Sequence, residues 1–186
     1  MKLYDEEISL KGNTFTIREV QESDKQDLLQ VYGDKNALPF FNGDNCEGDI
    51  FYYNTSEKID KAFDFWKYSK ENKWFRRLSI VHSSENRVIG TVELCYRGKD
   101  EFSDSTGILR VDVQSGYEEQ GVLQEIFSLI TPVFLRLIDG SVIITKIPSY
   151  AVERIAAASQ SGYTKSPIVL TGHKGEQYYD YWVHAS

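Results

Sequence analysis

The chain has 186 residues, of which 41% are hydrophobic and 13% aromatic, which is enough to build one large core in a single domain over residues 1–186. Asp and Glu outnumber Lys and Arg by 28 to 21, and the net charge of −7 repels phosphate backbones, which disfavours nucleic-acid partners. The sequence contains no run of 18 apolar residues, so no membrane-spanning segment is expected.

Apolar periodicity divides the chain into strands and helices. Ser23 and Gln26 fit a capping box that opens the first helix, and Gly162 fits a left-handed cap that ends the last one. Pro132 lies inside the longest helix and is expected to kink it or end it early. The aromatic segment 33–54 is too long for a structureless connection, so it is expected to contain a short helix or a lid. In chain order the prediction is a strand at 13–20, helices at 23–32 and 56–71, strands at 74–81 and 87–96, a polar turn at 98–105, a strand at 107–113, a helix at 117–138, a strand at 141–146, a helix at 149–161, and a terminal hairpin of 163–171 and 176–183.

Five motifs follow one another along this pattern. They are TIREVQESD at 16–24, VIGTVEL at 88–94, YEEQGVL at 117–123, SGY at 161–163 and YYDYWV at 178–183. Their order and spacing resemble the GNAT superfamily of acetyl-coenzyme A-dependent N-acetyltransferases, and within it the branch of the ribosomal-protein N-terminal alanine acetyltransferases. The resemblance covers nearly the whole chain. It implies an α/β fold with a mixed, splayed central sheet of about seven strands flanked by about four helices.

The resemblance implies that acetyl-coenzyme A binds where the third motif opens a helix. In the family this loop reads Gln/Arg-x-x-Gly-x-Gly/Ala, whose small residues let backbone N–H groups close on the pyrophosphate at the helix N-terminus. Only Gly121 keeps that pattern, since Glu118 and Leu123 replace the first and last positions. Glu118 and Glu119 would repel a diphosphate, although acids are favoured in the first turn of any helix. The residues implied for the cofactor are Val111, Val113, Gln120, Gly121, Val122 and Leu123, with the backbone of 109–113 pairing with the pantetheine arm.

Acetyl transfer to an amine needs a group that removes a proton from the ammonium, after which the neutral amine attacks the thioester directly. The family often uses a Glu on the central strands, and the candidates here are Glu93 and Asp112, on the faces opposite the most apolar sides of their strands. Solvated strand residues are the alternative for both. In the family an Asn at the start of the last helix often contacts the cofactor, and a Tyr near its end often protonates the departing thiolate. Here those positions are Ala151 and Ala158, so Tyr150 becomes the candidate for the general acid, with packing on the core as its alternative.

The remaining residues predict no competing chemistry. The three histidines and the two cysteines show no metal-ligand spacing, and two cysteines do not make a disulfide framework. Because the chain also starts without an apolar stretch, a cytoplasmic protein with no metal is expected. The aromatic and acidic residues of 39–53 could form an entrance for a cationic amine, or they could be core and lid packing.

The sequence therefore predicts an N-acetyltransferase that moves an acetyl group from acetyl-coenzyme A to a primary amine, either a peptide N-terminus or a small polyamine-like amine. The alternative is a GNAT-fold protein whose altered cofactor loop makes it a non-catalytic binding or regulatory module. Gly121 favours the enzyme, whereas Glu118, Glu119 and Leu123 favour the module. Either form could act as a homodimer.

Overall fold

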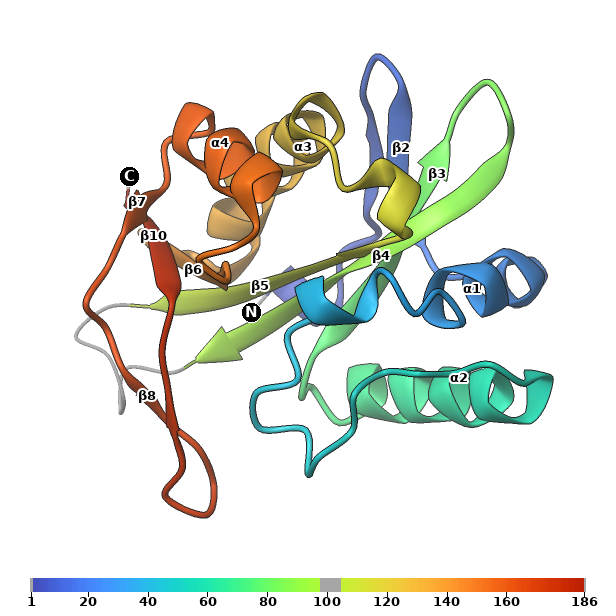
Figure 1. Cartoon of the computed structure of the whole chain (residues 1–186), viewed down its shortest axis with the longest axis horizontal. Coiled ribbons are helices and arrows are strands. Elements are labelled where there is room, and N and C mark those ends of the chain that lie inside the picture. Colours follow the sequence, from blue (N-terminus) through green and yellow to red (C-terminus); the bar gives the residue numbers. More distant parts are fainter. Residues whose placement is uncertain (1, 98–104, 186) are drawn as a thin grey trace.

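The computed structural model describes residues 2–97 and 105–185 (Figure 1). The polar turn expected at 98–105 therefore lies outside the described residues, except for Ser105. In chain order the elements are η1 (Lys2–Tyr4), β1 (Ser9–Lys11), β2 (Phe15–Glu19), η2 (Glu22–Asp24), α1 (Lys25–Tyr32), η3 (Leu38–Phe40), α2 (Ser56–Glu71), β3 (Arg76–His82), β4 (Arg87–Arg97), β5 (Thr106–Val113), η4 (Ser115–Tyr117), α3 (Gln120–Ile138), β6 (Val142–Lys146), α4 (Val152–Gln160), β7 (Thr164–Lys165), β8 (Leu170–Thr171), β9 (Gln177–Tyr178) and β10 (Tyr181–Ala185), where η marks a 3-10 turn.

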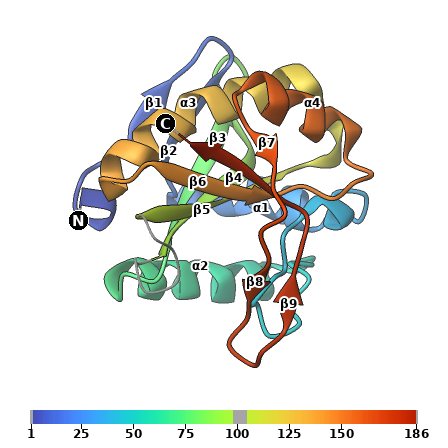
Figure 2. The ribbon, with the colours of Figure 1, turned by 90° about the vertical axis from the view of Figure 1, so that its left-hand side faces the viewer.

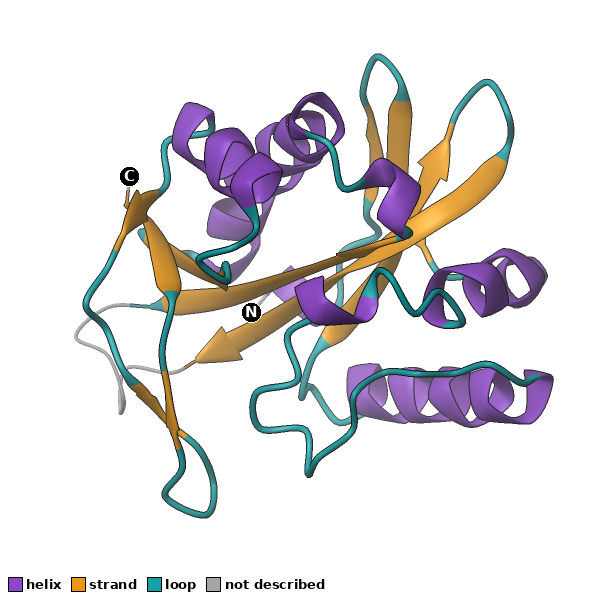
Figure 3. Cartoon of the chain, in the orientation of Figure 1, coloured by secondary structure: helices purple, strands orange, loops and turns teal. Residues whose placement is uncertain are grey.

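The main sheet has eight strands in the order β1-β2-β3-β4-β5-β6-β10-β7 (Figure 3). Within the described residues its neighbouring strands run antiparallel, except for the parallel pair β5 and β6. The short strands β8 and β9 form a separate hairpin that projects from the sheet (Figure 2). The predicted mixed α/β sheet with four flanking helices is confirmed, and β1 is the strand that the sequence pattern did not predict.

The helices form two layers around this sheet (Figure 1). On one face α3 and α4 pack over the apolar side of β5, where Leu109, Val111 and Val113 are buried. On the other face α1 and α2 enclose a second cluster that includes Tyr32 and Trp66. Alternate residues of β5 therefore enter different cores, since successive side chains of a strand point to opposite faces.

Helix α3 continues through the proline inside it. Pro132 is exposed, and so is Ser128, whose carbonyl loses its N–H partner, so water can take the place of the missing bond. The early end allowed by the sequence is therefore wrong. By length and composition α3 is the one helix of the described residues that could cross a membrane. Its apolar face is instead buried on the sheet, as the core helix of a domain requires.

Two local predictions are corrected by the structure. The first helix opens after η2 and not at a Ser23–Gln26 box, because the carboxylate of Asp24 accepts the Gln21 N–H (2.9 Å) and caps that turn itself. The terminal hairpin is not continuous. Its second arm breaks at Asp180, which has a φ of 66°, and the arm then enters the sheet between β6 and β7 as β10.

Candidate active site

The strands β5 and β6 begin as neighbours and then part. Their pairing joins Thr106 to Val142 and ends with Ile108 and Ile144, whereas β5 continues to Val113. The far half of β5 keeps β4 on one side and turns its other side toward α4. An opening of this kind in the middle of a sheet leaves backbone N–H and C=O groups that must find partners outside the ladder. We call this opening the β5/β6 slot.

The N-terminus of α3 lies at the end of β5, after η4. It is the strand-to-helix position at which the resemblance places the cofactor loop. A Cβ atom added to Gly121 would meet no heavy atom within 4 Å, and the same holds for Gly116. Neither glycine is thus required by packing against the chain, and both leave room for an approaching ligand. The side chain of Leu123, in contrast, is fully buried in the core.

Arg154, in the first turn of α4, reaches into the β5/β6 slot. Its Nη1 donates to the carbonyl oxygen of Val111 (2.8 Å) and to that of Phe40 (3.3 Å). Its Nε and Nη2 donate to the two carboxylate oxygens of Glu118, at 2.6 and 2.7 Å. The side chains of Arg154 and Glu118 are only 3% and 7% exposed. The slot thus contains a bidentate, nearly buried ion pair bonded to the strand that lines it.

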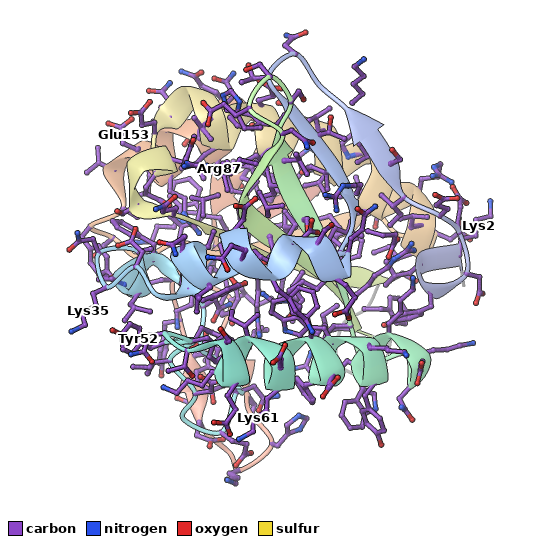
Figure 4. All side chains as sticks on the ribbon, turned by 90° about the vertical axis from the view of Figure 1, so that its right-hand side faces the viewer. Lys2, Lys35, Tyr52, Lys61, Arg87 and Glu153 are labelled. Carbon is purple, nitrogen blue, oxygen red and sulfur yellow. The ribbon has the colours of Figure 1, made fainter. Side chains whose placement is uncertain are left out.

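The residue before Arg154 occupies the helix end of the same site. Glu153 accepts the backbone N–H of Gln120, the first residue of α3, at 3.0 Å. Figure 4 shows Glu153 beside the turn that precedes α3. One turn earlier, the Tyr150 hydroxyl donates to the carbonyl of Pro39, and its ring meets Phe40 edge-on. Tyr150 is 59% exposed, so it lies at the surface and is not packed into the core.

The two candidate bases lie on the opposite face of the sheet, around Arg77. Arg77 donates to Asp112 (2.9 Å) and forms an ion pair with Glu93, which also pairs with Arg110 (3.1 Å). The hydroxyl of Tyr32 donates to Asp112 (3.0 Å). Burial alone would lower the pKa of Arg77, but the neighbouring Tyr32 and the two carboxylates hold that pKa well above its ordinary value.

Glu93 and Asp112 are therefore not solvated strand residues. They are 3% and 2% exposed, and each is held by arginine. A base role for either stays a prediction.

The aromatic and acidic residues of the predicted entrance already contact other residues of the protein. Phe51, Trp66 and Phe75 surround the Arg77 guanidinium, so the cation over these rings belongs to the protein. Asp44 pairs with Lys146 (2.6 and 2.7 Å). Its neighbouring acids Glu47 and Asp49 are bonded as well, to Lys174 and Tyr53.

A shallow hollow of about 480 Å³ lies between the 48–53 segment and α2, around Tyr52 and Lys61 (Figure 4). Two lysines, Lys58 and Lys61, stand at its walls against the single carboxylate of Asp49. This balance of charge does not favour a cationic amine. Elsewhere in the described residues no group of three or more His, Cys, Asp or Glu side chains could hold a metal ion.

Sequence reasoning missed the two arginines around which these sites are built. Arg154 occupies a position on the buried face of α4, three residues after Ala151 and three before Ala157. A charged residue at such a position was the available signal, because a buried arginine needs a partner. Arg77 gave no comparable signal, because its neighbours in the sequence include the polar Arg76 and Ser79, although the structure buries nearly the whole strand.

No protein-family profile and no curated protein matches the sequence. Solved structures do match it over nearly its whole length. A GNAT-family acetyltransferase from Bacillus anthracis superposes with a TM-score of 0.69 at 12% identity, covering 96% of this chain and 98% of that one. The chain has the GNAT fold.

Two further structures of this fold carry ligands. The ribosomal L7/L12 alpha-N-protein acetyltransferase RimL, in complex with coenzyme A, matches with a TM-score of 0.71 at 14% identity, covering 96% of this chain and 97% of that one. Spermidine N-acetyltransferase from Vibrio cholerae, in complex with coenzyme A and spermine, matches with a TM-score of 0.68 at 11% identity, covering 94% and 96%. Likeness at these identities establishes the fold, and the activity has to be argued from the site.

Proposed function

We propose that this chain is a cytoplasmic N-acyltransferase that takes acetyl-coenzyme A in the β5/β6 slot and passes the acetyl group to a primary amine. The parting of β5 and β6 beside the start of α3 carries this proposal. Leaving a buried backbone group without a partner costs about 1–3 kcal/mol, so a strand abandoned in mid-sheet is disfavoured unless its open edge is used. A pantetheine arm, which contains amide groups, is a suitable partner for that edge.

The residues around the slot fit such a cofactor on two counts. The Val111 carbonyl points into the slot, as its bond from Arg154 demonstrates, and Gly121 leaves free space at the start of a 19-residue helix. Backbone N–H groups at a helix start can receive a diphosphate. The charge of Glu118, which would oppose a diphosphate, is balanced by Arg154.

In this reaction the protein mainly binds and orients the cofactor. The bound coenzyme would supply the activated thioester carbonyl. Val111 would hold the pantetheine arm through its backbone, while Gln120, Gly121 and Val122 would face the diphosphate. Tyr150, exposed at the edge of the site and bonded to a backbone carbonyl through its hydroxyl, would donate a proton to the departing thiolate.

The acceptor follows from the fold relatives and not from a built pocket. The solved structures that match this chain include enzymes named for a ribosomal-protein N-terminus and for spermidine, so peptide N-termini and polyamines are the amines to test first. In this structure the side of the slot toward α1 and α2 is covered by Asp44, Lys146 and Arg110. An amine would enter there only after the segment that carries Asp44, between η3 and α2, moves. A homodimer remains a prediction.

One observation favours a second function. The bidentate pair of Arg154 and Glu118 already satisfies the open edge of β5 without any ligand, as in a protein that no longer carries out transfer. The second candidate is therefore a non-catalytic binding or regulatory module with the GNAT fold.

Thiol release from acetyl-coenzyme A, measured over a panel of peptides and polyamines, separates the two functions when combined with a thermal shift. The enzyme requires acetyl-coenzyme A to raise the melting temperature in a concentration-dependent way, by an amount that corresponds to about 2.7 kcal/mol at one hundred times Kd. It also requires amine-dependent thiol release. If millimolar acetyl-coenzyme A neither shifts the melting temperature nor gives thiol release, the non-catalytic module is the function that remains.

A further inference from the structure

Arg154 and the pantetheine arm of the proposed function need the same backbone group. The Val111 carbonyl accepts from Arg154 Nη1 at 2.8 Å, so a ligand amide cannot bond to it while this arginine stays in place. The inference below rests on the proposed function, because it concerns what must move before that cofactor can bind.

The arginine is held firmly in this position. All three guanidinium nitrogens donate, and both oxygens of Glu118 accept, so neither charged group lacks a partner in the closed state. Displacing one of them would leave the other buried and unpaired, which is the most costly way to break an ion pair of this kind. A ligand that enters the slot must therefore provide a new partner for the displaced group.

Glu153 extends the obstruction to the helix start. Its carboxylate accepts the Gln120 N–H, one of the first free amides of α3, in the position where a phosphate oxygen would bind. Two consecutive residues of one turn of α4 thus cover the strand edge and the helix end together. Tyr150, which precedes α4, is anchored on Pro39, and Arg154 also donates to the carbonyl of Phe40, so the start of α4 is tied to η3 as well.

We propose that Arg154 and Glu118 form an autoinhibitory contact that closes the β5/β6 slot against acyl-coenzyme A. The open state separates the guanidinium from Glu118 and from Val111. The freed arginine then faces the diphosphate, which replaces Glu118 as its anionic partner. The contact stabilises the closed state, in which the cofactor cannot bind, and so lowers the apparent affinity for the cofactor. Weakening the contact therefore strengthens binding.

Isothermal titration with acetyl-coenzyme A tests this contact without relying on turnover. Glu118→Gln keeps the size of the side chain and leaves Arg154 in place, while Arg154→Ala with Glu118→Gln removes the contact from the edge of β5 and leaves Glu153 at the helix start. We expect Glu118→Gln to lower Kd at least tenfold relative to the native chain, and the double variant to lower Kd less, because it lacks the arginine that faces the diphosphate. Glu119→Gln removes an exposed acid from the same helix start, and Glu6→Gln with Arg136→Gln removes a bidentate pair from the surface. We expect Glu119→Gln to lower Kd by less than Glu118→Gln does, because it removes only repulsion of the diphosphate, and the surface control to change Kd less than threefold.

The outcomes separate the contact from the function. If the native chain binds as tightly as both slot variants, the contact does not close the slot, and the proposed function stands. If Glu119→Gln tightens binding as much as Glu118→Gln, the effect is one of net charge and the contact is again refuted. If no protein binds at millimolar cofactor although circular dichroism shows all of them folded, the proposed function fails. The contact then fails with it, because the open variant should have bound.

Discussion

Replacing Arg77 tests whether the charges buried between β3, β4 and β5 hold the domain together. Arg77→Met keeps most of the side-chain volume but removes the cation shared by Glu93 and Asp112. Glu93 retains Arg110, so the stranded charge is that of Asp112, which is 2% exposed and keeps only neutral partners such as the Tyr32 hydroxyl. Removing one partner of a buried pair costs about 3–5 kcal/mol.

That loss is a large part of the total stability, since a domain of this kind is stable by about 5–15 kcal/mol. In a chain of this length each kcal/mol lowers the melting temperature by about 2–4 °C, so the expected drop is roughly 6–20 °C. Urea unfolding at pH 7 gives the free energy directly. The matched control is Arg136→Met, whose pair with Glu6 is half exposed and contributes at most about 1 kcal/mol.

A second substitution decides the cause of the loss. Adding Asp112→Asn to Arg77→Met removes the stranded charge and keeps a group that accepts from Tyr32, so we expect at least half of the lost stability to return. An Arg77→Met loss below 1 kcal/mol would refute the reasoning. A full loss that Asp112→Asn does not reverse would attribute the effect to the packing of Arg77 on Trp66 and its aromatic neighbours.

Three further predictions address other sites. Burial would raise the pKa of Asp24, but the bonds from Arg18, Ser79 and a backbone N–H hold that pKa below its ordinary value. The stabilisation by the ionised carboxylate is therefore complete above about pH 5 and lost as the pH falls below about 4. In urea titrations the difference in unfolding free energy between the native chain and Asp24→Asn should close as the pH falls below about 4. A gap that is constant with pH would contradict this. Gly121→Ala should leave the unfolding free energy unchanged or raise it by up to about 1 kcal/mol, while weakening acetyl-coenzyme A binding at least tenfold. The contrasting variant is Gly90→Ala, whose added Cβ would lie 2.1 Å from a backbone oxygen of β5. It should abolish folding, as seen by circular dichroism. Tyr150→Phe should lower kcat at least tenfold with unchanged cofactor Kd, and an unchanged kcat would remove it as the acid.

The elements that the sequence predicted well are those with strong local signals. Helix α2 has the predicted bounds because Thr55 accepts the N–H of Lys58 at its start and apolar residues then recur every three or four positions. The hairpin at the C-terminus was predicted as continuous because its break depends on the left-handed conformation of Asp180, a residue type that tolerates this conformation without requiring it.

The site shows the same division between local and distant causes. Gly121 could be located from its motif, since the strand, loop and helix are contiguous. The closure of the slot could not, because Arg154 meets Glu118 across 36 positions of sequence and Val111 across 43. Likewise, the pattern of β4 and β5 identified the faces of Glu93 and Asp112 but could not show that Arg77 lies between them.

The charges on the α1 and α2 side of the sheet form a chain of alternating sign. Arginine or lysine pairs with each acid, and the six members sum to zero. They are Asp112, Arg77, Glu93 and Arg110, linked by ion pairs, and the pair of Asp44 and Lys146, which is joined to them by the bond from Arg110 to the backbone carbonyl of Asp44. Because a single replacement at Arg77, Glu93 or Asp112 leaves an unpaired charge where side chains are only 2–3% exposed, sequence change at these positions is constrained to compensating steps. Homologous sequences should exchange acid and base here in pairs, or turn apolar together.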